Sequence, residues 1–212
     1  MSDARLLSVH VGAPREITDG ASPVWRSAYR KVLVTGPIWL GRAGLAGDGQ
    51  GDLDHHGGPD QAVLAYAAAH YPLWRAELGR PNFPYGAFAE NLVMFGMDEA
   101  TVCVGDVYAI GAARLQVTQP RGPCGKIARF WQIDDLTARV QENGRTGWYL
   151  RVLAEGNVEA GLPVLLRERP FAQWTIARAA DVLRRCQDEP EAAADLATCP
   201  ALGARWAQAL RG

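Results

Sequence analysis

Glycine and proline interrupt most of this chain and divide it into short apolar segments. The 212 residues include 23 glycines and 13 prolines, and short apolar runs between such residues are typical of strands joined by turns. Many short strands with Gly-rich turns favour a mainly β domain over residues 1–168, folded as a barrel or a sandwich. We expect strands at residues 5–11, 29–34, 37–40, 101–104, 107–110, 114–118, 149–153 and 162–167.

Helical patterns interrupt this series of strands and also follow it. Apolar residues at roughly helical spacing predict a helix over 59–78, which Pro72 breaks or restarts, and a shorter helix over 134–141. A small α-helical extension, residues 169–212, is expected to pack on the β domain or on a partner, because it is too small to fold alone. Rich in Ala, Leu and Arg, it predicts three helices, at 175–186, 189–196 and 201–210.

Charge and hydropathy exclude several classes of protein. The net charge is −1 and no long run of like charges occurs, so neither a nucleic-acid groove nor a polybasic membrane anchor is expected. The apolar stretches are too short to span a bilayer, and the polar N-terminus has no secretory signal. We therefore expect a cytoplasmic protein whose four cysteines, at 103, 124, 186 and 199, are free thiols.

The segment Gln119-Pro-Arg-Gly-Pro-Cys-Gly-Lys126 contains the cysteine with the clearest functional setting. Its prolines and glycines predict an irregular loop at a strand end, where functional groups are commonly displayed. Arg121 and Lys126 lie close to Cys124 in the sequence, and nearby cations favour the thiolate, which binds metals and attacks electrophiles. A buried structural cysteine is the alternative interpretation, since lone cysteines are commonly buried.

A second polar cluster, His55-His56-Gly57-Gly58, precedes the predicted helix at 59–78. Its glycine pair allows backbone amides to approach a ligand closely, and a helix N-terminus favours anions. Histidines bind metals or relay protons, although adjacent histidines lack the spacing of a usual zinc site. The alternative is a turn in which Asp60 caps the helix and one histidine is held by a hydrogen bond.

Two further segments carry weaker signals. Glu90 and Asn91 follow a glycine-led loop, which is equally well interpreted as a turn packed by its apolar neighbours. Arg145 lies between two glycines, where a guanidinium suits phosphate oxygens, although arginines are common in surface turns. Neither segment by itself establishes a site.

Taken together and in this order, the segments resemble the MOSC family, named after the C-terminal domain of molybdenum-cofactor sulfurases, and in particular its YiiM-like bacterial branch. The match covers nearly the whole chain, including the three-helix tail. The chain departs from the family pattern at Ala89, where Gly is usual, and at Gly122 and Gly125, where larger residues are common. The resemblance rests on the Cys124 segment, His-His-Gly-Gly-Pro-Asp at 55–60, Gly-Ala-Phe-Ala-Glu-Asn-Leu at 86–92, Gly-Asp-Val-Tyr at 105–108 and Gly-Arg-Thr-Gly-Trp-Tyr at 144–149.

The resemblance implies a β domain related to the pyruvate-kinase β-barrel, with Cys124 as a ligand to the molybdenum of a molybdenum-pterin cofactor. It implies the reduction of N-hydroxylated compounds, such as hydroxylaminopurines and amidoximes, with electrons from a separate flavin-dependent reductase. On this hypothesis His56 is the first candidate, and His55 the second, for the acid that protonates the departing oxygen or for a group that holds a cofactor ligand in place. Asn91 is expected to hydrogen-bond pterin or substrate. The other residues expected at the cofactor, for its phosphate, its charge or its close approach to backbone, are Arg121, Lys126, Arg145, Gly57 and Gly58.

Two other functions fit the same residues. The protein is alternatively a carrier, which holds the cofactor or a persulfide on Cys124 and passes it on without turnover. It is alternatively a metal-free thiol enzyme that uses Cys124 and a histidine. Turnover of an amidoxime argues against the carrier, and molybdenum that is lost on Cys124→Ser argues against the thiol enzyme.

Overall fold

Short strands make up most of the chain in the computed structural model, which describes residues 3–18, 24–51 and 57–211. The strands are β1 Arg5–Val11, β2 Arg15–Ile17, β3 Trp25–Ser27, β4 Val32–Leu33, β5 Ile38–Gly41, β6 Gly44–Leu45, β7 Val63–Ala67, β8 Leu92–Phe95, β9 Val107–Ile110, β10 Ala113–Pro120, β11 Trp148–Ala154, β12 Gly156–Val158 and β13 Val164–Glu168. The helices are η1 Pro59–Gln61, α1 His70–Glu77, α2 Lys126–Trp131, α3 Leu136–Asn143, α4 Ile176–Arg184, α5 Pro190–Ala197 and α6 Ala204–Arg211.

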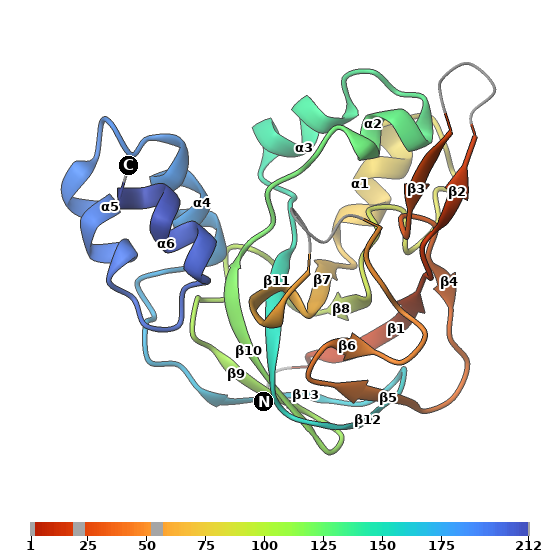
Figure 1. Cartoon of the computed structure of the whole chain (residues 1–212), viewed down its shortest axis with the longest axis horizontal. Coiled ribbons are helices and arrows are strands. Elements are labelled where there is room, and N and C mark those ends of the chain that lie inside the picture. Colours follow the sequence, from red (N-terminus) through yellow and green to blue (C-terminus); the bar gives the residue numbers. More distant parts are fainter. Residues whose placement is uncertain (1–2, 19–23, 52–56, 212) are drawn as a thin grey trace.

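An eight-stranded sheet forms the body of the protein (Figure 1). Its strand order is β13-β9-β10-β11-β7-β8-β1-β4, and β7 and β8 form the parallel pair in an otherwise antiparallel sheet. The sheet curls so that an isolated bridge joins Arg5 to Pro163, next to a hydrogen bond from Leu6 N to Leu162 O (2.9 Å). This pairing between β1 and the segment just before β13 covers backbone groups at strand edges that would otherwise be exposed. The expected mainly β, barrel-like fold is confirmed as a curled half-barrel.

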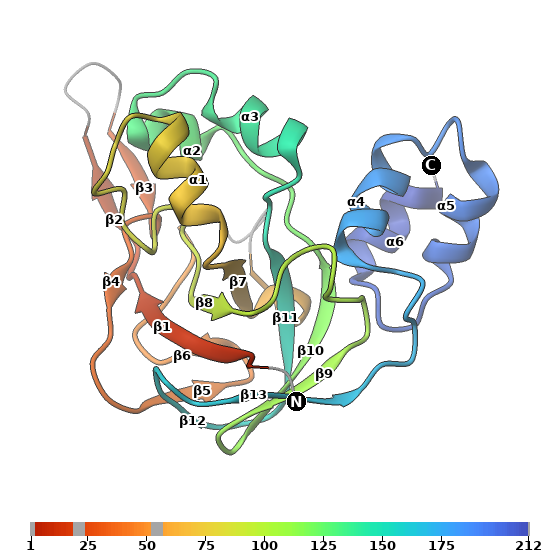
Figure 2. The ribbon, with the colours of Figure 1, turned by 180° about the vertical axis from the view of Figure 1, so that it is seen from behind.

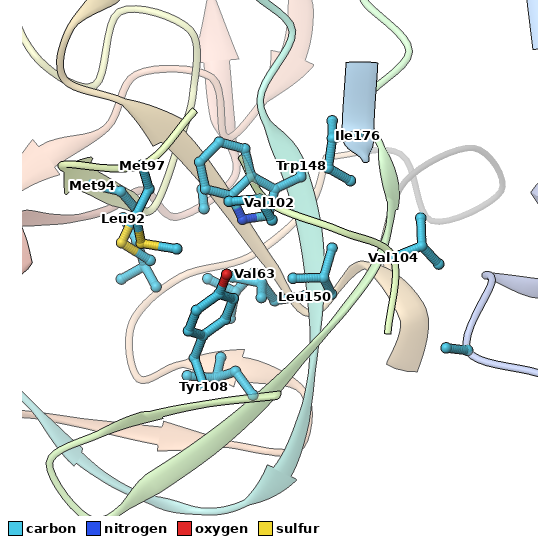
Figure 3. Packing of buried hydrophobic residues seen from close by; sticks show 14 of the residues in the cluster. Val63, Leu92, Met94, Met97, Val102, Val104, Tyr108, Trp148, Leu150 and Ile176 are labelled. Carbon is cyan, nitrogen blue, oxygen red and sulfur yellow. The ribbon is translucent and has the colours of Figure 1, made fainter. Parts of the chain in front are cut away.

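Large apolar side chains fill the inside of the curled sheet (Figure 3). Trp148 and Leu150 of β11 lie beside Val63 of β7, with Tyr108 of β9 across from them. All four are buried, and so is Ile176 of α4, which belongs to the same cluster. One core therefore joins the sheet to the C-terminal helices.

A second buried cluster, rich in aromatic rings, includes side chains of α1, α2 and α3, which lie together in the upper part of both views (Figures 1 and 2). The polar tips of its rings are satisfied: Trp74 Nε1 donates to the Tyr66 hydroxyl (2.7 Å), which donates to Arg145 O (3.0 Å). The cluster fixes α2, the helix that follows the Cys124 segment. Its members are Tyr29, Tyr66, Tyr71, Trp74, Phe83, Ala87, Phe88, Ile127, Leu136 and Val140.

The helix predicted over residues 59–78 is wrong. This segment divides into η1, the strand β7 and the helix α1. All five residues of β7 are buried, with β8 and β11 on either side. A strand buried on both faces has no alternation of apolar and polar residues, so its apolar run resembles a buried helix in the sequence.

The other expected elements differ less from the structure. The strand expected at 101–104 is wrong, since the segment is a turn with one bridge from Cys103 to Thr175, and the strand expected at 29–34 shrinks to β4. The helix expected at 134–141 is confirmed as α3, and Gly144 ends it in the left-handed conformation (φ 71°). No helix within the described ranges is long and apolar enough to cross a membrane.

Helices α4, α5 and α6 form the expected three-helix extension, at one side of the sheet (Figure 2). Thr175 begins α4 by accepting a hydrogen bond from Arg178 N (3.1 Å). Asp60, expected to cap the helix that follows it in sequence, instead accepts a hydrogen bond from Ala204 N (3.0 Å) at the start of α6. The extension therefore packs on the β domain, which is one of the two arrangements that the sequence left open.

Candidate functional site

One pocket brings together segments that lie far apart in the sequence. It holds about 690 Å³ of empty space, counting open solvent at its mouth. Loops that precede β4, β7 and β8 line it, together with the segment that follows β10. The lining residues are Ser27, Ala28, Tyr29, Lys31, Asp48, Gly49, Gln50, Gly51, Gly57, Gln61, Leu64, Ala89, Asn91, Arg121, Gly122, Cys124, Lys126 and Tyr149.

Cys124 is the cysteine of this pocket. Its side chain is partly exposed, whereas Cys103 and Cys199 are buried elsewhere. Its carbonyl accepts a hydrogen bond from Ile127 N (3.2 Å) at the start of α2, and Ile127 is anchored in the aromatic cluster. The thiol therefore stands on a fixed loop and is accessible from the pocket, which argues against a buried structural cysteine.

Arg121 lines the same pocket but is almost completely buried (5% exposed). Its backbone N–H donates to Gly147 O (3.0 Å), which holds the loop against the start of β11. Its Nη1 has no hydrogen-bond partner among the described residues. A buried donor left unpaired costs about 1–3 kcal/mol, and more when it is charged, so this position favours an anion in the pocket.

Two tyrosines lie near Arg121. Burial raises the pKa of Tyr29 and the pKa of Tyr149, and the charge of Arg121 opposes that rise in both. The Tyr29 hydroxyl donates to Ala87 O (2.7 Å). Both phenols are therefore neutral at pH 7, so Arg121 supplies the charge in this part of the pocket.

A buried ion pair between Lys31 and Asp48 forms another part of the pocket wall. The two side chains are only 6% and 5% exposed. Asp48 also accepts hydrogen bonds from Gly12 N (2.7 Å) and Asn91 Nδ2 (2.9 Å). No sequence motif marks Lys31 or Asp48, because a lysine and an aspartate 17 residues apart form no recognisable pattern.

Asn91 lines the pocket, but its amide is largely occupied within the protein. Besides Asp48, its Nδ2 reaches His10 O (3.2 Å), and its Oδ1 accepts a hydrogen bond from Leu64 N (3.1 Å). Asn91 therefore holds Asp48 in place and ties β8 to its neighbours. A direct hydrogen bond from Asn91 to pterin or substrate stays a prediction.

The glycine and histidine cluster is only partly described. Gly57 lines the pocket at φ 85°, and a Cβ there would lie 3.0 Å from Gln50 Oε1. Gly58 has the same φ of 85° but does not line the pocket. His55 and His56 lie outside the described residues, so their part in proton transfer stays a prediction.

Lys126 lines the pocket, as the sequence analysis expected, whereas Arg145 does not. The Arg145 guanidinium pairs with Glu77 of α1 (2.7 Å) and lies over the Trp74 ring, 5.1 Å from its centroid. These contacts hold Arg145 against α1. The structure therefore does not bring it to the cofactor phosphate expected from its sequence motif.

The loop before β8 supports the pocket through Glu90. This fully buried carboxylate accepts hydrogen bonds from Gly86 N (2.6 Å), Phe88 N (3.0 Å) and the Tyr71 hydroxyl. Burial raises the pKa of Glu90. Ala89 has a left-handed φ of 61°, a conformation that glycine adopts more readily than alanine.

The side chains of the pocket suit a metal that is already bound in a larger anionic group better than they suit a bare metal ion. A bare metal ion is typically held by three or four protein ligands, and the described part of the chain gathers no group of three His, Cys, Asp or Glu that could do so. A metal already bound by a pterin dithiolene needs only one more thiolate, which Cys124 offers. The unpaired Nη1 of Arg121 then suits the negative charge of that group.

Comparison with known proteins shows the family to which the chain belongs. The model of the MOSC domain matches residues 52–165, more than half of the chain. The chain therefore belongs to the MOSC family, whose domain is associated with binding of the molybdenum cofactor.

Within this family the chain is similar to YiiM. It is 38% identical to protein YiiM of Escherichia coli over 158 residues, 74% of this chain and 70% of that protein. The crystal structure of YiiM from Geobacillus stearothermophilus superposes with a TM-score of 0.83 at 34% identity, covering 98% of this chain and 97% of that one. A protein of Gibberella moniliformis named reductase is 37% identical over 163 residues, which are 74% of this chain but only 28% of that longer protein.

Proposed function

We propose that this protein is a molybdenum-cofactor-dependent oxidoreductase that reduces N-hydroxylated compounds, such as hydroxylaminopurines and amidoximes. One observation carries the proposal: an accessible thiol, Cys124, shares a pocket with a buried arginine, Arg121, whose Nη1 has no partner among the described residues. The first group suits a soft metal and the second suits an anion.

Three residues of the pocket then have defined tasks. Cys124 would bind the molybdenum, and Arg121 and Lys126 would bind the pterin phosphate. When bound, the cofactor supplies the two electrons that cleavage of an N–OH bond consumes, and a separate flavin-dependent reductase replaces them. The protein itself holds the substrate, supplies protons and limits the access of water. The similarity to a relative that is named a reductase supports turnover over simple carriage of the cofactor.

The test begins with the metal. Protein purified from a host fed with molybdate is analysed for molybdenum per chain and for pterin fluorescence, as wild type and as Cys124→Ser. We expect near-stoichiometric molybdenum in the wild type and a loss of at least tenfold in Cys124→Ser. Cys186→Ser is the matched control, because Cys186 is a comparably exposed thiol outside this pocket, and it should keep its molybdenum.

Turnover is then measured with benzamidoxime and a chemically reduced flavin donor. Reduction to benzamidine by the wild type supports the proposal. Molybdenum without turnover, with several electron donors, would show that the protein is a carrier instead. Molybdenum retained in Cys124→Ser would show that Cys124 is not the ligand.

A further inference from the structure

Lysine is confined to this pocket. The chain has 22 basic residues other than histidine, and lysine occurs only at positions 31 and 126, so the other 20 are arginines. Both lysines line the pocket. Arginine and lysine both serve in surface ion pairs, but they differ in one respect: a lysine ammonium can give up a proton to a reacting group, whereas a guanidinium stays protonated. A chain that uses arginine nearly everywhere else therefore places both of its lysines at one site.

Lys31 is firmly held in the pocket wall. Its side chain is 6% exposed and pairs with Asp48, whose carboxylate is fixed by Gly12 N and Asn91 Nδ2. An ammonium has three N–H donors, and within the described part of the chain Asp48 takes one of them. Two remain for a ligand in the pocket.

Four other residues, which lie near Lys31 or line the same pocket, are poor acids at pH 7. Burial, followed by the charge of Lys31, lowers the pKa of the nearby His10 to about 4, so His10 is neutral and has already lost its second proton. Tyr29 and Tyr149 hold their protons tightly because burial raises the pKa of each. Arg121 does not release a proton.

We propose that Lys31, positioned by Asp48, donates the proton to the hydroxyl oxygen of the substrate, in place of His56, the donor expected from the sequence. The inference rests on the proposed function. Reduction of R–NH–OH to R–NH₂ breaks the N–O bond, consumes two electrons and two protons, and releases water. The electrons come from the reduced cofactor named above, one proton goes from Lys31 Nζ to the departing oxygen, and the other reaches the nitrogen from solvent. Solvent then returns a proton to Lys31.

A binding readout tests the contact without turnover. Growth on [13Cε]lysine gives a protein with two lysine Cε signals in NMR spectra, because the chain has two lysines, and Lys31→Arg assigns them. Benzamidoxime added to the oxidised, cofactor-loaded protein should shift the Lys31 signal in a saturable manner. A Lys31 signal that stays still while the same sample, once reduced, converts benzamidoxime to benzamidine would overturn the proposal.

Turnover of Lys31→Arg tests the proton itself. This variant keeps the cation beside Asp48, so it should fold and keep its molybdenum and pterin fluorescence. General acid catalysis contributes about 10²–10⁴-fold, so we expect kcat to fall by about 10²-fold or more with KM within about threefold of wild type. A kcat within about threefold of wild type, or a loss of molybdenum, would overturn the proposal.

A second variant guards against misfolding. Lys31→Met with Asp48→Asn removes both charges, so no unpaired buried charge is left, and it should show the same loss of kcat with molybdenum retained. Measurements on two different proteins test the proposed function and the role of Lys31 separately. A wild type that holds molybdenum but reduces no N-hydroxylated compound refutes the function, whereas an active Lys31→Arg refutes only the role of Lys31.

Discussion

Asp60 connects the pocket to the C-terminal extension, and its removal should destabilise both. One carboxylate oxygen pairs with Arg151 (2.8 Å) and the other accepts a hydrogen bond from Ala204 N (3.0 Å) at the start of α6. The Asp60 carbonyl accepts a hydrogen bond from the Thr118 hydroxyl (2.7 Å). Its neighbour Gln61 lines the pocket. The substitution Asp60→Ala removes the two side-chain contacts and leaves the carbonyl contact in place.

The expected loss follows from these two contacts. The side chains of Arg151 and Asp60 are 23% and 32% exposed, so solvent screens the ion pair and limits it to about 0.2–1 kcal/mol. The hydrogen bond to Ala204 N acts as a helix cap, which contributes about 1 kcal/mol. We expect Asp60→Ala to lower the free energy of unfolding by about 1.2–2 kcal/mol. In a chain of this size the loss corresponds to a fall in Tm of roughly 2–8 °C.

Urea unfolding followed by circular dichroism measures this loss. Asp60→Asn keeps one acceptor and should lose about half as much. Glu168→Ala is the matched control, because Glu168 forms an exposed pair with Arg114 (58% and 48% exposed) in which no residue of the extension takes part, and it should change stability by less than about 0.5 kcal/mol. If Asp60→Ala is no less stable than Glu168→Ala, the extension is not held through Asp60 and the reasoning is refuted.

Two further predictions concern the interior. Gly147→Ala should lower the free energy of unfolding by more than about 2 kcal/mol in urea titrations, because φ is 75° and the added Cβ would lie 2.4 Å from Ala65 O. Gly144→Ala is the control, with φ 71° and no atom within 4 Å of the added Cβ, and it should lose only about 1 kcal/mol. Equal losses in the two variants would contradict a steric clash at Gly147. Burial raises the pKa of Glu90 above its usual 4.5, so above about pH 4.5 the folded protein binds more protons than the unfolded chain, and its stability falls as the pH rises towards the folded pKa. Glu90→Gln should remove this part of the slope in unfolding measured between about pH 4 and 8, and an unchanged slope would assign it to another group.

Local features of the sequence predicted much of the fold. The extension followed from an Ala-, Leu- and Arg-rich tail, and α3 followed from its apolar spacing and Gly144. The prediction from sequence failed where burial on both faces of a strand removes the alternation of apolar and polar residues. All five side chains of β7 are buried, so the period-2 signal of a strand is absent and the segment was predicted as part of a helix.

The candidate site was also predictable from the sequence only in part. Cys124, Arg121 and Lys126 are neighbours in sequence, so their common setting was visible without a structure, and the pocket contains all three. Only the tertiary structure shows that Ala89 has a left-handed φ of 61°. The sequence cannot state a backbone angle, since the surrounding fold imposes it.

By itself, the sequence determined that Cys124 stands on a rigid loop between two cations, because proline, glycine and charge act over a few residues. Only the tertiary structure decided which distant groups share its pocket. It brought Lys31 and Asp48 there, and it turned Arg145 towards Glu77, 68 residues away. Such contacts depend on how the curled sheet brings its loops together, and no short-range pattern encodes that arrangement.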